Sequence, residues 1–334
     1  MSKQVKIAID VMGGENSPCK VIDGIQIALS KDKNIFFNLY GEKNKIDNEI
    51  YKIKNLNQHF KIIDTKDVIS DDESPLSAAK RGKNSSMWKA IESQKEGFSD
   101  ISLSAGNTGA LLVMSRLILN TMSGISKPAL AGLWPNNNNM NVVLDLGANV
   151  ECNDKNLIDF AIMGSALFKS LFNDDKPKIA LLNIGSEENK GNDILKKTFS
   201  TLKEKKTDNY DFCGYIEGNH IMDGNVDVII TDGFTGNIAL KTAEGTANFI
   251  TSNLKKSLNK LSMLLSYRSL KKFKEKLDPR KYNGAIFLGL QSPVVKSHGA
   301  TDALGFAYSI AMCKKIVESD LIEKIKSHLI DVDL

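Results

Sequence analysis

The stretch ISLSAGNTGALL, residues 101–112, joins a short apolar run to a turn rich in glycine and polar residues, and then to a helical pattern. The same order recurs after five other apolar runs, at Val5 to Ile9, Val142 to Leu144, Ile179 to Leu182, Val226 to Ile230 and Ala285 to Leu288. Short runs that are apolar on both faces and alternate with helices are typical of a parallel sheet covered by helices. The sequence therefore predicts an α/β protein built on a mainly parallel sheet.

The turns after these runs carry Gly together with Asn, Asp, Ser or Thr. In a parallel sheet such turns gather at the carboxyl edge, where helix N-termini present free backbone N–H groups to ligands. Taken singly, a turn of this kind can simply end a strand and cap a helix. Six turns of the same character on one edge predict an anion-binding pocket.

Composition and charge fit a globular protein and name no partner. The chain has 334 residues, 42% apolar and 25% charged, which excludes a disordered, collagen-like or disulfide-stapled chain. Its 44 Lys plus Arg against 40 Asp plus Glu give a net charge of +4, but Arg is scarce and aromatic residues are not enriched. Because proteins that bind nucleic acids rely on Arg and stacked aromatics, we expect no nucleic-acid partner.

The sequence carries no motif of a metal site, a cofactor site or a membrane span. The four cysteines are far apart, without a CxxC pair or a histidine at zinc-ligand spacing. The glycine fingerprints of dinucleotide and P-loop sites are missing, as is the G-x-S-x-G elbow. The N-terminus lacks the apolar region of a signal peptide, and residues 109–119 are too short to span a bilayer. We therefore expect a cytoplasmic protein with no cofactor, no metal and no covalent enzyme intermediate.

Seven blocks follow one another along nearly the whole chain: DVMGG (10–14), RGKNSSM (81–87), SAGNTGAL (104–111), LDLGANVEC (144–152), LNIGSEENKG (182–191), DGFTGN (232–237) and HGA (298–300). In this order they resemble the bacterial phosphate acyltransferase family, the phosphate:acyl-acyl carrier protein acyltransferases of phospholipid synthesis.

The resemblance implies that a long-chain fatty acyl group passes from the thioester of acyl carrier protein to inorganic phosphate. The product, acyl phosphate, would supply a membrane glycerol-3-phosphate acyltransferase. The family also implies a three-layer α/β/α sandwich like that of isocitrate dehydrogenase and phosphotransacetylase, in one domain spanning residues 1–334. The family further implies a homodimer that associates peripherally with the inner face of the cell membrane.

The residue types suit direct attack by phosphate. Like other phosphoryl groups, phosphate is mostly dianionic at neutral pH and needs little help from a general base. A thiol leaves readily, so a strong general acid is optional. The protein's main tasks are to position the phosphate and to stabilise the developing oxyanion with N–H donors and one or two cations.

Four residues are candidate catalytic groups. Lys190, in a turn after a buried strand, is the first candidate cation for both the phosphate and the oxyanion. Asn107 can orient the thioester carbonyl or cap a helix. Asp232 can orient a donor, accept a proton weakly or cap a helix. His298, in a turn flanked by glycine, can carry a proton or bind phosphate, although a lone histidine is more often structural.

The candidate phosphate-binding residues lie in the same turns. Arg81 has the planar fork that binds an oxyanion with two hydrogen bonds, with an ion pair as the alternative. Ser85 can donate to phosphate or cap the helix that follows it. The full set is Asp10, Gly13, Gly14, Arg81, Lys83, Ser85, Gly106, Thr108, Asn149 and Asn237.

Residues 251–283 differ from the rest of the chain, because ten basic and two acidic residues give them a net charge of +8. Leucines at helical spacing predict two amphipathic helices with an apolar tip. Such a hairpin suits an anionic membrane surface or an acidic partner such as acyl carrier protein; the alternative is a dimer interface. The candidate docking residues are Lys255, Lys256, Leu261, Leu264, Leu265, Arg268, Lys271 and Lys272.

Three other functions remain open from the sequence. A short-chain phosphotransacetylase that uses acyl-CoA would share the fold and the nucleophile, but has less need of the basic hairpin. A non-catalytic membrane scaffold of lipid synthesis would explain the hairpin and leave the polar turns without a role. An oxidoreductase like isocitrate dehydrogenase is weakened by the lack of an evident metal-binding Asp cluster.

Overall fold

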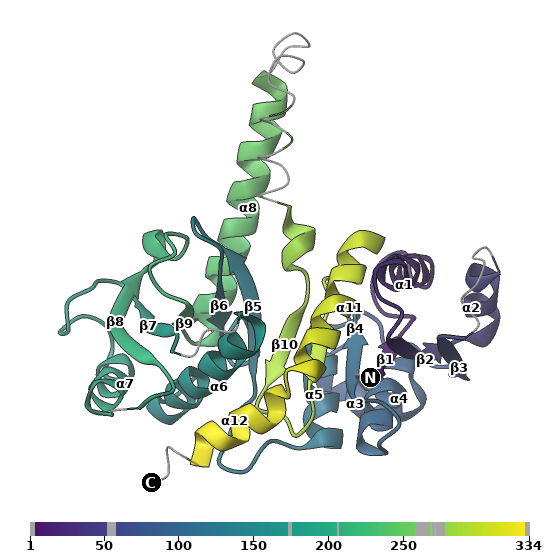
Figure 1. The fold of residues 1–334 in the computed structure, drawn as a ribbon, viewed down its shortest axis with the longest axis horizontal. Helices are drawn as coiled ribbons and strands as arrows, with labels where there is room; N and C mark the ends of the chain where they lie inside the picture. The colour runs from purple at the N-terminus through teal and green to yellow at the C-terminus, as the bar shows by residue number, and fades with distance from the viewer. Residues whose placement is uncertain are drawn as a thin grey trace.

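The computed structural model describes residues 4–51, 58–172, 176–205, 207–257, 268, 271 and 278–330. The strands of these residues form one 11-stranded sheet in the order β3-β2-β1-β4-β11-β10-β5-β6-β9-β7-β8 (Figure 1). Their bounds are β1 Val5–Asp10, β2 Ile35–Gly41, β3 Phe60–Asp64, β4 Ile101–Ser104, β5 Ala129–Pro135, β6 Met140–Leu144, β7 Lys178–Asn183, β8 Asp211–Glu217, β9 Val228–Ile230, β10 Ala285–Leu288 and β11 Val294–Lys296.

Helices cover both faces of this sheet. One face packs against α1, α6, α7, α11 and α12, and the other packs against α3, α4, α5 and α8. The predicted three-layer α/β/α arrangement is therefore confirmed. The helix bounds are α1 Cys19–Lys31, α2 Lys43–Ile50, α3 Pro75–Arg81, α4 Ser86–Lys95, α5 Thr108–Leu119, α6 Asp154–Phe172, α7 Asp193–Glu204, α8 Gly233–Ser257, α11 Ala303–Glu318 and α12 Leu321–Ile330, with short 3-10 turns at Gly82–Asn84, Gly218–His220 and Pro279–Tyr282.

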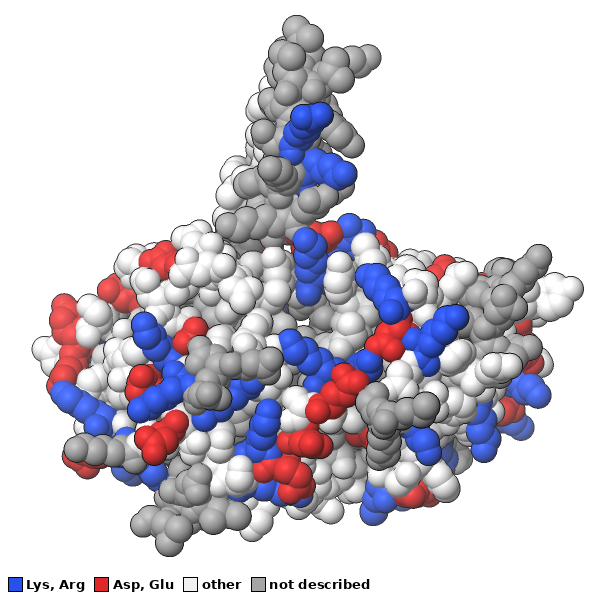
Figure 2. Space-filling view, in the orientation of Figure 1, with Lys and Arg blue, Asp and Glu red and all other residues white. Residues whose placement is uncertain are grey.

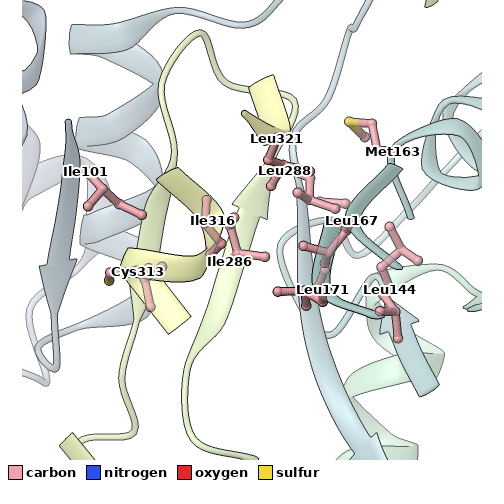
Figure 3. Close-up of a cluster of buried hydrophobic side chains, with 14 of the residues drawn as sticks. Ile101, Leu144, Met163, Leu167, Leu171, Ile286, Leu288, Cys313, Ile316 and Leu321 are labelled. Atoms are coloured by element: carbon pink, nitrogen blue, oxygen red, sulfur yellow. The ribbon is translucent and has the colours of Figure 1, made fainter. Parts of the chain in front are cut away.

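The core lies where α6, α11 and α12 meet the middle of the sheet. Leu167 and Leu171 of α6 and Ile316 of α11 point toward Ile286 and Leu288 of β10 (Figure 3), and each of these side chains is at most 4% exposed. Burial of each one stabilises the fold by roughly 1.5–3 kcal/mol relative to an exposed position. The rigid sheet that results carries the polar turns at its strand ends.

Strand direction divides the sheet into two parallel sets. The first set is β3, β2, β1, β4 and β11, and the second is β6, β9, β7 and β8. Between them, β10 is antiparallel to both β11 and β5, and β5 is antiparallel to β6. The two sets therefore run in opposite senses. The expectation that all six turns share one carboxyl edge is wrong, and the turns fall into two groups.

The strand–turn–helix order fails at the sixth apolar run. Strand β10 turns back and pairs with β11, so the turn that carries His298 follows β11. The other five runs coincide with β1, β4, β6, β7 and β9, with small shifts at their ends.

Helix α8 projects from the body of the molecule (Figure 1). It extends to Ser257, so the predicted hairpin, residues 251–283, begins inside this helix. Between residues 258 and 277 the structure describes only Arg268 and Lys271, both helical and exposed, and Lys256 at the end of α8 is exposed too. Leu261, Leu264, Leu265, Lys272 and the side chain of Lys255 lie outside the described residues. Across the described part of the chain, no helix combines the length and the apolar character needed to cross a bilayer.

Candidate active site

Asp10 ends β1 and organises the first group of turns. Its side chain is 1% exposed, and its two carboxylate oxygens accept hydrogen bonds from the hydroxyls of Ser86 and Ser104, at 2.6 and 2.7 Å. Burial raises the pKa of the Asp10 carboxyl above its ordinary value, while these hydrogen bonds oppose the rise. Because both oxygens are engaged inside the protein, Asp10 holds the turns together instead of facing a ligand.

Two glycine-containing turns interlock beside Asp10. A Cβ on Gly13 would lie 2.6 Å from the backbone nitrogen of Gly106, which leaves no room for a side chain. Gly14 has a φ of +81°, and a Cβ there would lie 2.8 Å from the carbonyl oxygen of Ala105. The structure thus brings together the predicted residues at positions 10, 13, 14 and 106.

Two lysines that the sequence reasoning missed enter this group. Lys20 on α1 is 5% exposed, and its ammonium donates to the carbonyl of Gly299. Lys296, at the end of β11, donates to the carbonyls of Ser297 and, at 3.2 Å, Ala105. Burial lowers the pKa of Lys20, and it lowers the pKa of Lys296 to about 8. In a chain with 40 lysines, only the position of Lys296 two residues before His298 could have indicated a role.

His298 lies in the turn after β11. Its backbone N–H donates to Oδ1 of Asn283 at 2.9 Å, and its ring Nδ1 accepts from the N–H of Ala300 at 3.2 Å. Burial lowers the pKa of the imidazole, Lys241 and other nearby lysines lower it further, and Glu244 opposes them. A neutral His298 whose Nδ1 accepts a hydrogen bond carries its proton on Nε2. The exposed ring therefore offers an N–H donor.

Asn107 is the N-cap of α5, as one of its two predicted roles required. Its Oδ1 accepts from the N–H of Ala110 at 3.0 Å. Its Nδ2 donates to the carbonyls of Ser70, Asp71 and Glu73, which ties their loop to the helix. Thr108, the next residue, is exposed in the first turn.

The candidates on α3 and its neighbours make structural contacts. Arg81 forms a bidentate ion pair with Glu73, with its Nε 2.5 Å from Oε1, and half of its side chain is exposed. Ser85 is buried, caps α4 by accepting from the N–H of Trp88 and donates to the carbonyl of Gly82. The structure therefore uses Arg81 and Ser85 in the ion pair and the cap that the sequence left as alternatives. Lys83 is exposed in the connecting turn.

Asp145 organises the second group of turns, and sequence reasoning did not single it out. The side chain is fully buried and accepts hydrogen bonds from the backbone N–H groups of Leu130, Gly147, Ala148 and Asn149. It also accepts from Nδ2 of Asn149, at 2.8 Å, and this amide donates to the carbonyl of Pro128 as well. The signal was an Asp at the end of an apolar strand, before a turn with glycine, as at Asp10.

The N-terminus of α8 completes the second group. Asp232 accepts hydrogen bonds from the backbone N–H and the hydroxyl of Thr235, at 2.8 and 2.9 Å, so it caps the helix. Asn237 is exposed, and its Nδ2 lies 2.8 Å from where a Cβ of Gly147 would be. The candidates Asn149, Asp232 and Asn237 are therefore neighbours.

Lys190 lies on the turn after β7, the strand beside β9. Its backbone N–H donates to Glu187, and its carbonyl accepts from Nδ2 of Asn183 at 3.3 Å. The side chain is exposed. By strand order Lys190 belongs to the second group, so the structure separates it from His298 and Asn107.

The first turns of α8 connect the two groups. The helix begins beside Asp145, where the N–H of Gly233 donates to the carbonyl of Asn149. A few turns later, Lys241 and Glu244 are near enough to His298 to shift its pKa. Figure 2 shows Lys and Arg side chains interspersed with Asp and Glu on the body around the base of this helix. The arrangement offers cations, an imidazole N–H and several helix N-termini, which suit an anion and a developing oxyanion.

Comparison with known proteins gives matches over nearly the whole chain. Residues 5–324 match the model of the family described as "Fatty acid synthesis protein". The chain is 59% identical to the phosphate acyltransferase of Pelagibacter ubique, over 98% of this chain and 100% of that protein. It is 42% identical to the phosphate acyltransferase of Agrobacterium fabrum, over 97% of this chain and 94% of that protein.

Solved structures with the same fold are more distant in sequence. A phosphotransacetylase from Streptococcus pyogenes superposes with a TM-score of 0.63 at 16% identity, over 97% of this chain and 95% of that chain. The EutD phosphotransacetylase from Staphylococcus aureus gives a TM-score of 0.60 at 16% identity, over 95% of this chain and 94% of that chain. At this level of identity the likeness shows the fold alone.

Proposed function

The chain belongs to the phosphate acyltransferase family, so it is an acyltransferase that acts on phosphate, and from that premise we propose that its acyl donor is a long-chain thioester of acyl carrier protein. The observation that supports this donor is the set of exposed cations Lys256, Arg268 and Lys271 on the basic segment, because an acidic carrier protein is complementary to them in charge.

In the proposed reaction a phosphate oxygen attacks the carbonyl carbon of the thioester. The new C–O bond forms, and the carbonyl oxygen becomes an oxyanion that N–H donors and a cation stabilise. When the tetrahedral intermediate collapses, the C–S bond breaks, and the thiolate leaves and takes up a proton. The Nε2–H of the neutral His298 is the proposed hydrogen-bond donor to the leaving thiolate, which takes its proton from water. Lys190, the candidate cation in the second group of turns, is separated from His298, so it is proposed to contact the acyl donor away from the reacting carbon.

The remaining candidates support this chemistry indirectly. Asn107 and Asp232 fix the starts of α5 and α8, so we propose that they keep the N–H groups of these helices aimed at the substrates. Gly13, Gly14 and Gly106 allow the backbone to approach closely. Asn237, exposed beside the turn at Gly147, is a proposed ligand of the acyl phosphate.

We further propose that the basic segment docks the enzyme on its partners. The described residues Lys256, Arg268 and Lys271 are exposed, and cations on a projecting helix attract anionic lipid headgroups and acidic carrier proteins. Membrane docking would bring acyl phosphate to a membrane glycerol-3-phosphate acyltransferase. We also propose that the protein is a homodimer in the cytoplasm.

The decisive experiment offers the purified protein inorganic phosphate with palmitoyl-acyl carrier protein, and traps acyl phosphate with hydroxylamine. Acetyl-CoA in a parallel reaction tests the short-chain phosphotransacetylase alternative. We expect hydroxamate only from the carrier-protein thioester. Product from acetyl-CoA and none from the carrier protein would overturn the proposed donor.

A further inference from the structure

Two lysines of the first group, the buried Lys20 and the half-buried Lys296, have no role in the proposed reaction. Lys20 comes from α1 and Lys296 from β11, and both ammonium groups lie near the turn at Gly14. The position where a Cβ of Gly14 would lie is 2.9 Å from Nζ of Lys20 and 2.8 Å from the carbonyl oxygen of Ala105. That same carbonyl accepts the hydrogen bond from Lys296. The two cations therefore share one set of backbone neighbours.

Both cations make their hydrogen bonds to carbonyl groups. Lys20 donates to Gly299, and Lys296 donates to Ala105 and Ser297. Within the ranges that the structure describes, no carboxylate oxygen lies within 4 Å of either ammonium. A buried charge without a counter-charge is costly, and two of the same sign cost more. The site is electrostatically incomplete as it stands.

The acidic residues around the two lysines do not supply the missing counter-charge. Asp10 is close enough to influence Lys296, but its oxygens are occupied by Ser86 and Ser104. Asp71 acts on both lysines and Glu15 on Lys20, and these two acids are exposed. Lys241 on α8 adds another positive charge near Lys296.

We propose that Lys20 and Lys296 form the subsite that binds the phosphate group, with His298 beside it. This inference rests on the proposed function, because it names the cations that hold that reaction's nucleophile. A phosphate dianion between the two ammonium groups would supply the missing counter-charge. Lys190, in the second group, has no part in this subsite.

The lysines also set a pH dependence for phosphate binding. Burial and Lys20 lower the pKa of Lys296 to about 8, so its ammonium loses its proton as the pH rises through that value. Asp10 and Asp71 oppose this shift, and Lys241 reinforces it. Because phosphate is already dianionic at pH 8, its affinity should fall as the pH rises from 8 to 9.5.

Titration calorimetry with inorganic phosphate tests the subsite on the full chain. We expect Lys20→Met and Lys296→Met each to raise the Kd for phosphate by about tenfold or more, since a hydrogen bond to a charged group contributes about 1.5–3 kcal/mol. Lys296→Arg should restore most of the affinity. Lys315→Met is the control, because Lys315 also donates to a carbonyl, that of Leu171 on α6, outside both groups of turns.

Kinetics separate the outcomes. In the lysine variants the KM for phosphate should rise while the KM for the acyl donor stays the same. If both variants bind phosphate as tightly as the wild type, the subsite is overturned, even if the enzyme makes acyl phosphate. If the variants lose phosphate affinity but the wild-type protein makes no acyl phosphate, only the proposed function is overturned. If a variant fails to fold, a wild-type Kd that does not change between pH 8 and 9.5 overturns the inference. A second titration uses pantetheine 4′-phosphate, which contains the phosphate that joins the pantetheine arm to the carrier protein. If the lysine variants weaken the binding of this compound but not of inorganic phosphate, the proposal is contradicted.

Discussion

Lys190 differs from the other candidate catalytic residues in that its side chain stands exposed at the second group of turns, away from His298. We expect Lys190→Ala to raise the KM for the acyl donor by about tenfold and to change kcat little, because the side chain lies away from the turns where the phosphate reacts and a lost hydrogen bond from a charged group costs about 1.5–3 kcal/mol. The melting temperature should change little, since the side chain is exposed. Lys33→Ala, at an exposed lysine between α1 and β2, is the matched control for both measurements. An unchanged KM for the acyl donor in Lys190→Ala would remove this residue from the binding of the donor.

The protonation state of His298 predicts how the reaction rate depends on pH. Because burial lowers its pKa below 6.5, the imidazole is neutral at pH 7 and gains a proton only at lower pH. Protonation turns Nδ1 into a donor, which breaks its hydrogen bond from Ala300 and disturbs the turn. The rate should therefore fall on the acid side. His298→Gln should lower kcat by up to about 100-fold at pH 7.5 and remove this contribution.

The comparison of the two pH profiles checks that prediction. Phosphate itself loses its second charge on acidification, and that loss remains in both proteins. The wild-type profile of kcat should be steeper below pH 6.5 than the profile of His298→Gln. Identical shapes would mean that the titration of His298 does not affect the reaction.

The supporting residues of the site show where sequence reasoning ended. The turns at Asp10 and Asn107 could be singled out because each lies in a recognisable strand–turn–helix block. Lys20 could not be singled out from the sequence, because its partner Gly299 is 279 residues away in the chain. Contacts of this kind arise only when the whole sheet has formed.

At the scale of elements, apolar runs indicated the positions of most central strands, but not their directions. A run such as Val142 to Leu144 is apolar on both faces whether its neighbour is parallel or antiparallel. Direction is set by connections, and the antiparallel pairing of β5 with both β10 and β6 reverses the second half of the sheet. For that reason one predicted edge became two groups of turns.

The start of α8 depends on a close backbone contact that a mutation can test. A Cβ on Gly236 would lie 1.9 Å from the carbonyl oxygen of Asp145, so Gly236→Ala must displace either the helix or the turn. Because overpacking of this kind costs about 1–3 kcal/mol, we expect a lower melting temperature and reduced activity. On the same helix, a Cβ on Gly245 meets nothing within 4 Å. Gly245→Ala should therefore stabilise the protein by up to about 1 kcal/mol, and equal melting temperatures for the two variants would contradict the contact.

At the scale of the whole molecule, the uneven distribution of charge sharpens the proposal for docking. Taking the +8 of residues 251–283 from the total of +4 leaves −4 for the other 301 residues. An acidic body is repelled by anionic lipid and by an acidic carrier protein, so attraction to either must come from the basic segment. The attraction should weaken with added salt, because exposed charges are screened within about 8–10 Å at physiological ionic strength.

Replacement of both Leu264 and Leu265 by Glu separates the two functions predicted for this segment. If its apolar tip enters a membrane, the double variant should lose cosedimentation with anionic phospholipid vesicles and keep the oligomeric state of the wild type, because two carboxylates oppose burial in lipid. If the tip packs against a second subunit, the variant should become monomeric in sedimentation analysis. Leu117→Glu is the control, since Leu117 on α5 is 60% exposed outside the segment. Unchanged vesicle binding would rule out docking through this tip, because the carboxylates lie where the lipid contact is proposed.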